Sequence, residues 1–167
     1  MTPFPGLDPE LRAARLAPPA GPVRVVVDTD CANEIDDQFA LAWALLRPDR
    51  LRVEAITAEP FSFRHHLRGL RAAEAALEGG SREDEALVGG FQGWARRLRD
   101  QGRRVDALQL VGPEAGMELS HAEILRVLGH MGHDPAGRVL RGAPRYMTGP
   151  DDAVGSEAAT AIIDLAK

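Results

Sequence analysis

Five carboxylates lie within ten residues of this chain, and their spacing is better suited to chemistry than that of any other segment. They are Asp28, Asp30, Glu34, Asp36 and Asp37. Like charges a few ångströms apart raise one another's pKa, and a bound hard cation relieves the repulsion most simply. Carboxylate oxygens suit Ca²⁺ or Mg²⁺ better than zinc or copper. The segment therefore predicts a divalent-cation site.

A purely structural interpretation of these acids is also open. Asp28 and Asp30 would cap a turn, while Asp36 and Asp37 would complement the positive N-terminus of a helix, for a few tenths to about 1 kcal/mol each. Capping needs one or two acids, whereas this segment has five. We therefore favour the cation site.

Two other acidic motifs compete for the same residues. An EF-hand loop starting at Asp28 would need a ligand at Ala32 and a glycine at Asn33, and it would follow a helix. A strand followed by Asp-x-Asp also resembles the start of haloacid-dehalogenase-type phosphohydrolases, which use Mg²⁺. Ala32 departs from that pattern, and the Asp36–Asp37 pair has no role in it. The EF-hand is excluded, and the phosphohydrolase remains the alternative enzyme.

The flanking sequence predicts the elements that position the acids. The β-branched run Val23–Val27 predicts a buried parallel strand that ends at Asp28, and Leu51–Thr57 predicts a second strand. Between them, helical spacing predicts a helix with an apolar stripe, with Trp43 in the core; the stripe comprises Ile35, Phe39, Ala42, Trp43 and Leu46. This βαβ pattern predicts an α/β fold with a mostly parallel sheet and flanking helices. Ligands of such sheets bind at the carboxyl ends of the strands.

The rest of the chain divides into an arm and the remainder of the α/β domain. Residues 1–22 contain six of the twelve prolines, so they predict a lead-in arm with a short helical turn at Pro9–Leu16. Residues 23–167 form the predicted domain. Its further predicted elements are helices over His65–Leu77 and Phe91–Gln101 with a polar turn at Ser81–Glu85, a helix begun by the capping box Ser120–Glu123, a strand over Arg138–Leu140, and a last helix capped by Ser156.

Composition excludes several classes of function. The net charge of −5 argues against a polymeric nucleic acid or a membrane surface as partner. The longest apolar run, Phe39–Leu46, has eight residues, whereas a membrane span needs about 20. The single cysteine, Cys31, excludes an internal disulfide or a thiolate metal site. We expect a cytoplasmic protein whose metal, if any, is held by oxygen or histidine.

Two motifs around the acids resemble a known family. Asp28-Thr29-Asp30, followed by Asp36-Asp37-Gln38-Phe39-Ala40-Leu41, resembles the N-terminal signature of the inosine/uridine-preferring nucleoside hydrolases. Here Cys-Ala-Asn-Glu replaces the usual Pro-Gly turn and two extra residues separate the second and third aspartates, as in a divergent branch. Residues 116–120 and 156–159 are similar to that branch, so the resemblance covers residues 23–60 and 115–167.

The resemblance implies roles for individual residues. Asp30 would bind Ca²⁺ and accept the proton of the attacking water, and Asp37 would be a bidentate Ca²⁺ ligand. Asp36 would bind the ribose hydroxyls. Asp28 and Asn33 would orient these acids without binding the ion or the substrate themselves. The implied reaction is Ca²⁺-dependent hydrolysis of the N-glycosidic bond of a ribonucleoside or related ribosyl compound, on a nucleoside-hydrolase-like, Rossmann-like fold.

The resemblance also implies that the site is incomplete. The family's ribose-binding Asn is not evident after the second strand, where Glu59 would substitute as a hydroxyl acceptor. The family's further metal-binding Asp and its leaving-group His come from a second half that this sequence lacks. We expect an apparently truncated N-terminal half, completed by a homo-oligomer or a complementing chain. A non-catalytic metal- or sugar-binding protein is the alternative from another functional class.

Three remaining residues favour a local structural role. His65 and His66 are adjacent on a predicted helix, so their rings diverge and a solvated pair is expected. Cys31 lies among carboxylates, which should raise its pKa and lower its nucleophilicity, so it is interpreted as a small turn residue.

Overall fold

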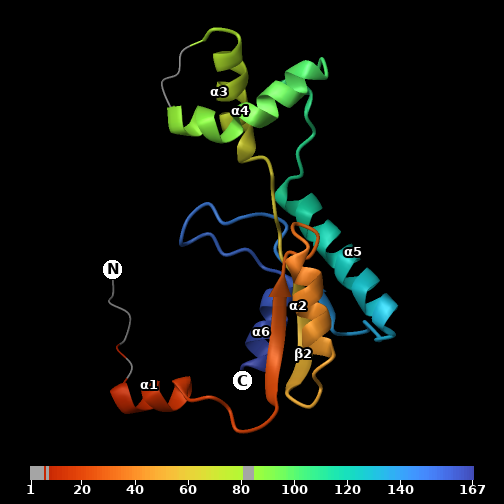
Figure 1. Ribbon diagram of the computed structural model, residues 1–167. Coiled ribbons are helices and arrows are strands. Elements are labelled where there is room, and N and C mark those ends of the chain that lie inside the picture. Colours follow the sequence, from red (N-terminus) through yellow and green to blue (C-terminus); the bar gives the residue numbers. More distant parts are fainter. Residues whose placement is uncertain (1–5, 7, 81–84) are drawn as a thin grey trace.

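A computed structural model describes residues 6, 8–80 and 85–167 of the chain. Its centre is a three-stranded parallel sheet in the order β1-β2-β3, formed by β1 (Val23–Thr29), β2 (Leu51–Ala58) and β3 (Val139–Arg141) (Figure 1). The register of β1 on β2 runs from Val23 opposite Leu51 to Thr29 opposite Ala58. The predicted α/β class with a parallel sheet is confirmed.

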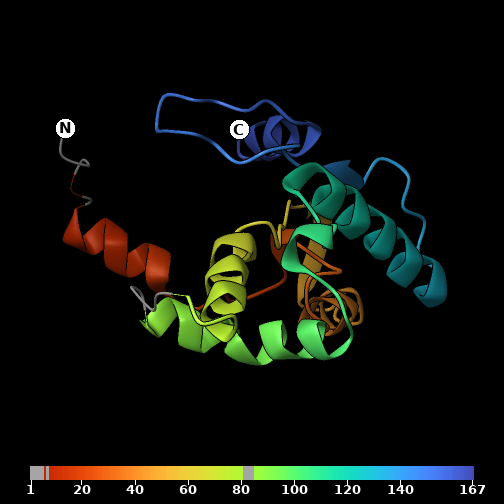
Figure 2. The ribbon, with the colours of Figure 1, turned by 90° about the horizontal axis from the view of Figure 1, so that it is seen from above.

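Three helices flank this sheet. The helices α2 (Asp36–Leu45) and α5 (Pro113–Met131) cover one face, and α6 (Glu157–Leu165) lies against the other (Figure 2). The main core lies between β2, α2 and α5 and is made by Cys31, Leu41, Leu45, Ile56, Ala58, Ile124, Val127 and Leu128. The last helix begins as predicted, because the Ser156 side chain accepts a hydrogen bond from the Ala159 amide at 3.0 Å.

A separate helical unit is inserted between β2 and α5. It comprises α3 (His66–Leu77), α4 (Glu85–Asp100) and the 3₁₀ turn η1 (Val105–Ala107), and it lies beyond the carboxyl ends of the strands (Figure 1). Gly69 is required here, because a Cβ at that position would lie 2.2 Å from the Phe91 ring. The unit has its own small core, centred on Leu70, Leu98 and Val105.

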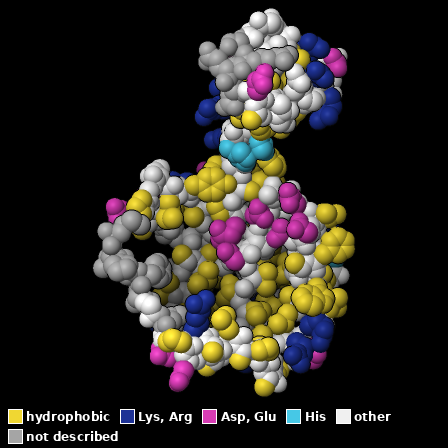
Figure 3. Space-filling view, turned by 60° about the vertical axis from the view of Figure 1, so that its left-hand side comes forward, with side chains coloured by type: hydrophobic (Ala, Val, Ile, Leu, Met, Phe, Trp, Pro, Cys, Tyr) yellow, Lys and Arg dark blue, Asp and Glu magenta, His cyan; other side chains and the backbone are white. Residues whose placement is uncertain are grey.

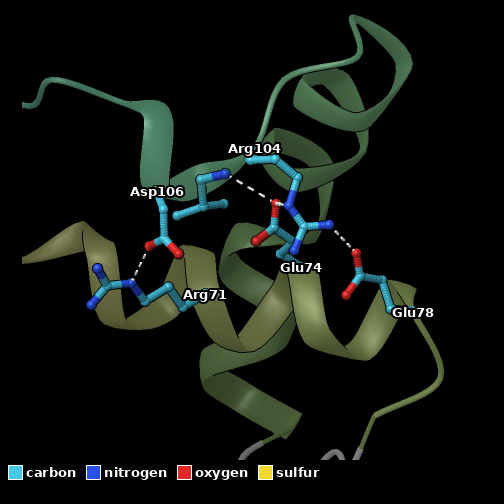
Figure 4. A network of polar contacts seen from close by, with 6 residues as sticks. Arg71, Glu74, Glu78, Arg104 and Asp106 are labelled. Atoms are coloured by element: carbon cyan, nitrogen blue, oxygen red, sulfur yellow. Dashed lines mark hydrogen bonds and ion pairs between the residues drawn. The ribbon is translucent and has the colours of Figure 1, made fainter.

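Polar contacts hold η1 against α3 (Figure 4). Arg71 Nε donates to Asp106 at 2.8 Å, and the Val105 amide donates to Glu74 Oε1 at 3.0 Å. Arg104 pairs with both Glu74 and Glu78. Helix α4 begins at Glu85, six residues before the predicted Phe91, while most of the turn predicted at Ser81–Glu85 lies outside the described residues.

The predicted helical turn in the arm is the helix α1 (Pro9–Leu16). The Asp8 carboxylate caps it by accepting hydrogen bonds from the amides of Glu10 at 2.9 Å and Leu11 at 3.0 Å. None of its residues is buried. This helix therefore projects from the sheet and its covering helices (Figure 1).

Two predictions for the helices were wrong. Helix α5 begins at Pro113, so Ser120 lies inside it and is fully buried instead of forming a capping box. Its hydroxyl donates to the Glu59 carbonyl at 3.0 Å, a contact that only the folded chain creates. In α2 the large residues of the predicted stripe are exposed, Trp43 included, and Leu41, Ala44 and Leu45 are buried instead. Helix α2 is apolar on both sides, so periodicity does not identify its inner face.

Candidate functional site

The sheet brings acids from two strands to one edge. Asp28 and Asp30 lie at the carboxyl end of β1, and Glu59 directly follows β2. The Glu59 amide donates to the Thr29 carbonyl at 2.8 Å, which continues the parallel pairing beyond the last residue of β2. This is the edge at which open α/β sheets bind ligands.

A hydrogen bond joins the carboxyl groups of Asp28 and Glu59. Burial, the hydrogen bond to Asp28 and the nearby charges of Asp28 and Asp30, in that order of size, together raise the pKa of Glu59 to about 7. The Thr57 hydroxyl donates to Asp28 from the neighbouring position in the register. Near neutral pH Glu59 is therefore partly protonated, so this carboxyl group can both donate and accept a proton.

Local hydrogen bonds orient the other two acids of the predicted ion site. The Asn33 side chain donates to Asp30 Oδ2 at 3.0 Å, and the Asn33 amide donates to the Asp30 carbonyl at 2.9 Å. The buried Thr29 hydroxyl donates to Asp37 Oδ1. One oxygen of each carboxylate is thus held in place.

The loop between β1 and α2 turns sharply inward at Cys31. That side chain is fully buried in the main core, so the interpretation as a simple turn residue was incomplete. Burial raises the pKa of the Cys31 thiol to about 12, with smaller contributions from Glu123 and Asp37. The predicted increase is confirmed, although burial and not the carboxylates is its main cause. The next residue, Ala32, has a φ of +138°, a conformation that L residues rarely adopt.

The five acids of the segment do not form a single cluster. Glu34 and Asp36 are exposed, and neither side chain makes a hydrogen bond or ion pair among the described residues. Among residues 6, 8–80 and 85–167, no three His, Cys, Asp or Glu side chains form a group that could hold a metal ion by themselves. The structure therefore brings together Asp28, Asp30 and Glu59, with Asp37 tethered to Thr29.

A second set of polar groups at this end of α2 was not predicted. Gln38 Nε2 donates to Glu123 Oε1 on α5 at 3.0 Å, and Gln38 Oε1 is buried with no hydrogen-bond partner in the described part of the chain. The Arg126 guanidinium lowers the pKa of Glu123. Thr57 was missed as well, because it stands within an apolar run that predicts only a strand.

The histidine pair lies where the helical unit joins the sheet domain (Figure 3). The ring centroids of His65 and His66 are 3.9 Å apart, and the His66 ring packs on Phe63 at 6.0 Å and Phe91 at 5.3 Å. Burial lowers the pKa of His66, and its Nδ1 is buried without a partner among the described residues. The prediction of a solvated pair is therefore wrong for His66, which packs among aromatic rings.

The chain matches no protein-family model, no curated protein and no solved structure. The resemblance to nucleoside hydrolases therefore stays a prediction from residues 23–60 and 115–167. Among the helices that the structure describes, none is long and apolar enough to cross a membrane.

Proposed function

We propose that the acidic edge of the sheet catalyses Ca²⁺-dependent hydrolysis of the N-glycosidic bond of a ribonucleoside or related ribosyl compound. The observation that carries this proposal is the pairing of Asp28 with Glu59 beside Asp30 at the carboxyl ends of two parallel strands. The motif resemblance suggests the reaction class, and the geometry supports it by bringing carboxyl groups from two strands to one edge.

The chemistry of the donors fits Ca²⁺, but their number is small. Asp30 and Asp37 offer hard carboxylate oxygens, and each already has one oxygen oriented by a neighbouring side chain. Ca²⁺ takes six to eight oxygens, and the described residues provide no ready group of three ligating side chains. We therefore expect a weakly held ion with much of its coordination supplied by water.

Each acid has a distinct task in this proposal. Asp30 accepts a proton from the attacking water, and Asp36 and Glu59 bind hydroxyls of the ribose. Asp28 holds Glu59 in place. The ribosyl carbon becomes positively charged in the transition state, and the surrounding carboxylates stabilise that charge. Ca²⁺, when bound, would supply the charge that lowers the pKa of a nearby water.

No described side chain is assigned to protonate the leaving base. Losing a general acid costs about 10²–10⁴ in rate. We therefore expect the isolated chain to release base well below the rates of typical enzymes, about 1–10³ s⁻¹. A homo-oligomer or a complementing chain would supply the missing group.

Release of free base from inosine and uridine with Ca²⁺ present tests the proposal. Slow release should fall at least about 10²-fold in Asp30→Asn, while Asp151→Asn, which changes an exposed carboxylate, should leave it unchanged. Release that is absent, or equal in wild type and Asp30→Asn, contradicts the proposal. Phosphate release from a phosphomonoester with Mg²⁺, abolished by Asp28→Asn, would instead support the phosphohydrolase.

A non-catalytic binding protein gives a third result. It would bind Ca²⁺ or ribose in calorimetry, yet release neither base nor phosphate.

A further inference from the structure

Helix α2 presents a second apolar face to solvent. Ile35, Phe39, Trp43 and Leu46 are 73%, 69%, 64% and 68% exposed. At 100° per residue these four side chains fall within an arc of about 80°, so they form one stripe along the helix. We call these four residues the α2 stripe. Figure 3 shows hydrophobic side chains along the right-hand side of the sheet domain, between acidic groups above and basic groups below.

The α2 stripe is a large apolar surface to leave in contact with water, and patches of this size are often functional. A helix that is apolar all round is normally buried on all sides, yet the sheet and α5 cover only one side of α2. A large side chain has roughly 150–250 Å² of surface, so four of them at these exposures offer about 500 Å². Two such stripes together reach the roughly 1,000 Å² that a specific interface needs.

Opposite charges stand at the two ends of the α2 stripe. Glu34 and Asp36 are exposed at its start, and Arg47 and Arg50 are exposed at its end. Arg47 is paired with Asp49 at 2.8 Å. Within the described ranges, the side chains of Glu34, Asp36 and Arg50 have no hydrogen bond or ion pair.

We propose that the α2 stripe is the interface of a symmetric dimer, in which α2 of a second copy of this chain packs antiparallel on it. An interface of this symmetry must be complementary to itself. With the two-fold axis near residue 41, Phe39 meets the partner's Trp43, and Ile35 meets the partner's Leu46. The same axis sets the acidic start of each stripe against the basic end of the other.

The charge pattern selects this arrangement over a parallel one. A parallel pair would set Glu34 and Asp36 against the same acids of the partner, and like charges opposite one another are unfavourable. The antiparallel pair brings the partner's Arg50 to the end of α2 where Glu34 and Asp36 lie. The dimer therefore places a cation from the second copy near the acidic edge. This proposal does not depend on what the acidic edge binds.

Sedimentation equilibrium of the full chain tests the dimer. Wild type should sediment with twice the 18.0 kDa of one chain. Trp43→Glu should raise the dissociation constant at least about 30-fold, since it removes a central aromatic contact of each copy. Ile163→Glu is the matched control, because Ile163 is 58% exposed on α6, outside the α2 stripe. Circular dichroism verifies that each variant is folded.

A charge exchange makes the test independent of the aromatic residues. Arg50→Glu should weaken the dimer about tenfold. The double variant Glu34→Arg/Arg50→Glu should restore it, because it reverses the charges of both symmetry-related pairs between residue 34 of one copy and residue 50 of the other. A monomeric wild type overturns the proposal. So does a dimer that responds to Ile163→Glu but not to Trp43→Glu, or a double variant that is weaker than Arg50→Glu alone.

Discussion

Glu59 is the residue whose charge depends most on the fold. Its sequence neighbours give no hint of a perturbed acid, and only its position after the second strand, where the resembled family has an Asn, points to it. The parallel register sets Asp28 opposite Thr57, two residues before Glu59, and the Glu59 carboxyl group bonds to Asp28 while burial raises its pKa. A pattern of residue types contains neither the strand register nor the burial, so the Asp28–Glu59 pair could not be predicted.

The raised pKa of Glu59 predicts a pH-dependent stability. Its folded pKa of about 7 exceeds the ordinary 4.5, so between these values the folded protein binds more protons and the free energy of unfolding falls as pH rises. Urea denaturation should show wild type losing about 1 kcal/mol relative to Glu59→Gln between about pH 4 and pH 8, after allowance for solvent screening.

A second acid provides the control for this pH dependence. The pKa of Glu118 is lowered by its bond to Arg141, so Glu118→Gln should change the pH dependence in the opposite sense. A Glu59→Gln profile parallel to wild type would contradict the assigned pair.

Ala32 predicts a stabilising substitution. Its φ of +138° suits glycine, and relief of about 1–3 kcal/mol of strain should exceed the 0.4–1 kcal/mol that glycine costs through the unfolded chain. Ala32→Gly should therefore raise the free energy of unfolding by about 1 kcal/mol in urea denaturation. Ala136→Gly, at an exposed loop residue without positive φ, should lower it. An equal loss in the free energy of unfolding for both variants would contradict backbone strain at Ala32.

At the scale of elements, helix α5 depends on a close contact at its start. A Cβ on Gly116 would lie 2.0 Å from the Phe61 carbonyl oxygen, whereas a Cβ on Gly129 of the same helix meets nothing within 4 Å. Gly116→Ala should destabilise the fold by more than about 2 kcal/mol, and Gly129→Ala should stabilise it by about 0.5–1 kcal/mol. Thermal unfolding of the two variants distinguishes them, and similar melting temperatures would contradict this packing.

The elements that were predicted well are those with a strong local signal. The β-branched run and the second apolar run are β1 and β2, and the third strand lies at Val139–Arg141, one residue beyond the prediction. The start of α5 and the inner face of α2 were wrong, because tertiary contacts decide both. Ser120 satisfies every local rule for a helix N-cap, yet its hydroxyl donates a hydrogen bond to the Glu59 carbonyl.

At the scale of the whole molecule, the acidic segment extends from the edge of the sheet to the start of α2. Asp28, Asp30 and Glu59 face the edge of the sheet, whereas Glu34 and Asp36 lie at the start of the α2 stripe. Sequence spacing predicts one crowded cluster, because spacing does not tell how the loop distributes the acids in space. The helical unit beyond the sheet edge was predicted as two helices, but its position follows only from the completed fold.

We propose that the acidic edge binds Ca²⁺ through Asp30 and Asp37. Titration calorimetry of the folded chain with Ca²⁺ tests it most directly. We expect weak binding that raises the melting temperature through linkage. Asp37→Asn, which keeps an acceptor for the Thr29 hydroxyl, should abolish both effects, whereas Asp151→Asn should retain them. A folded wild type that gives no binding heat and no Ca²⁺-dependent change in melting temperature would contradict the account.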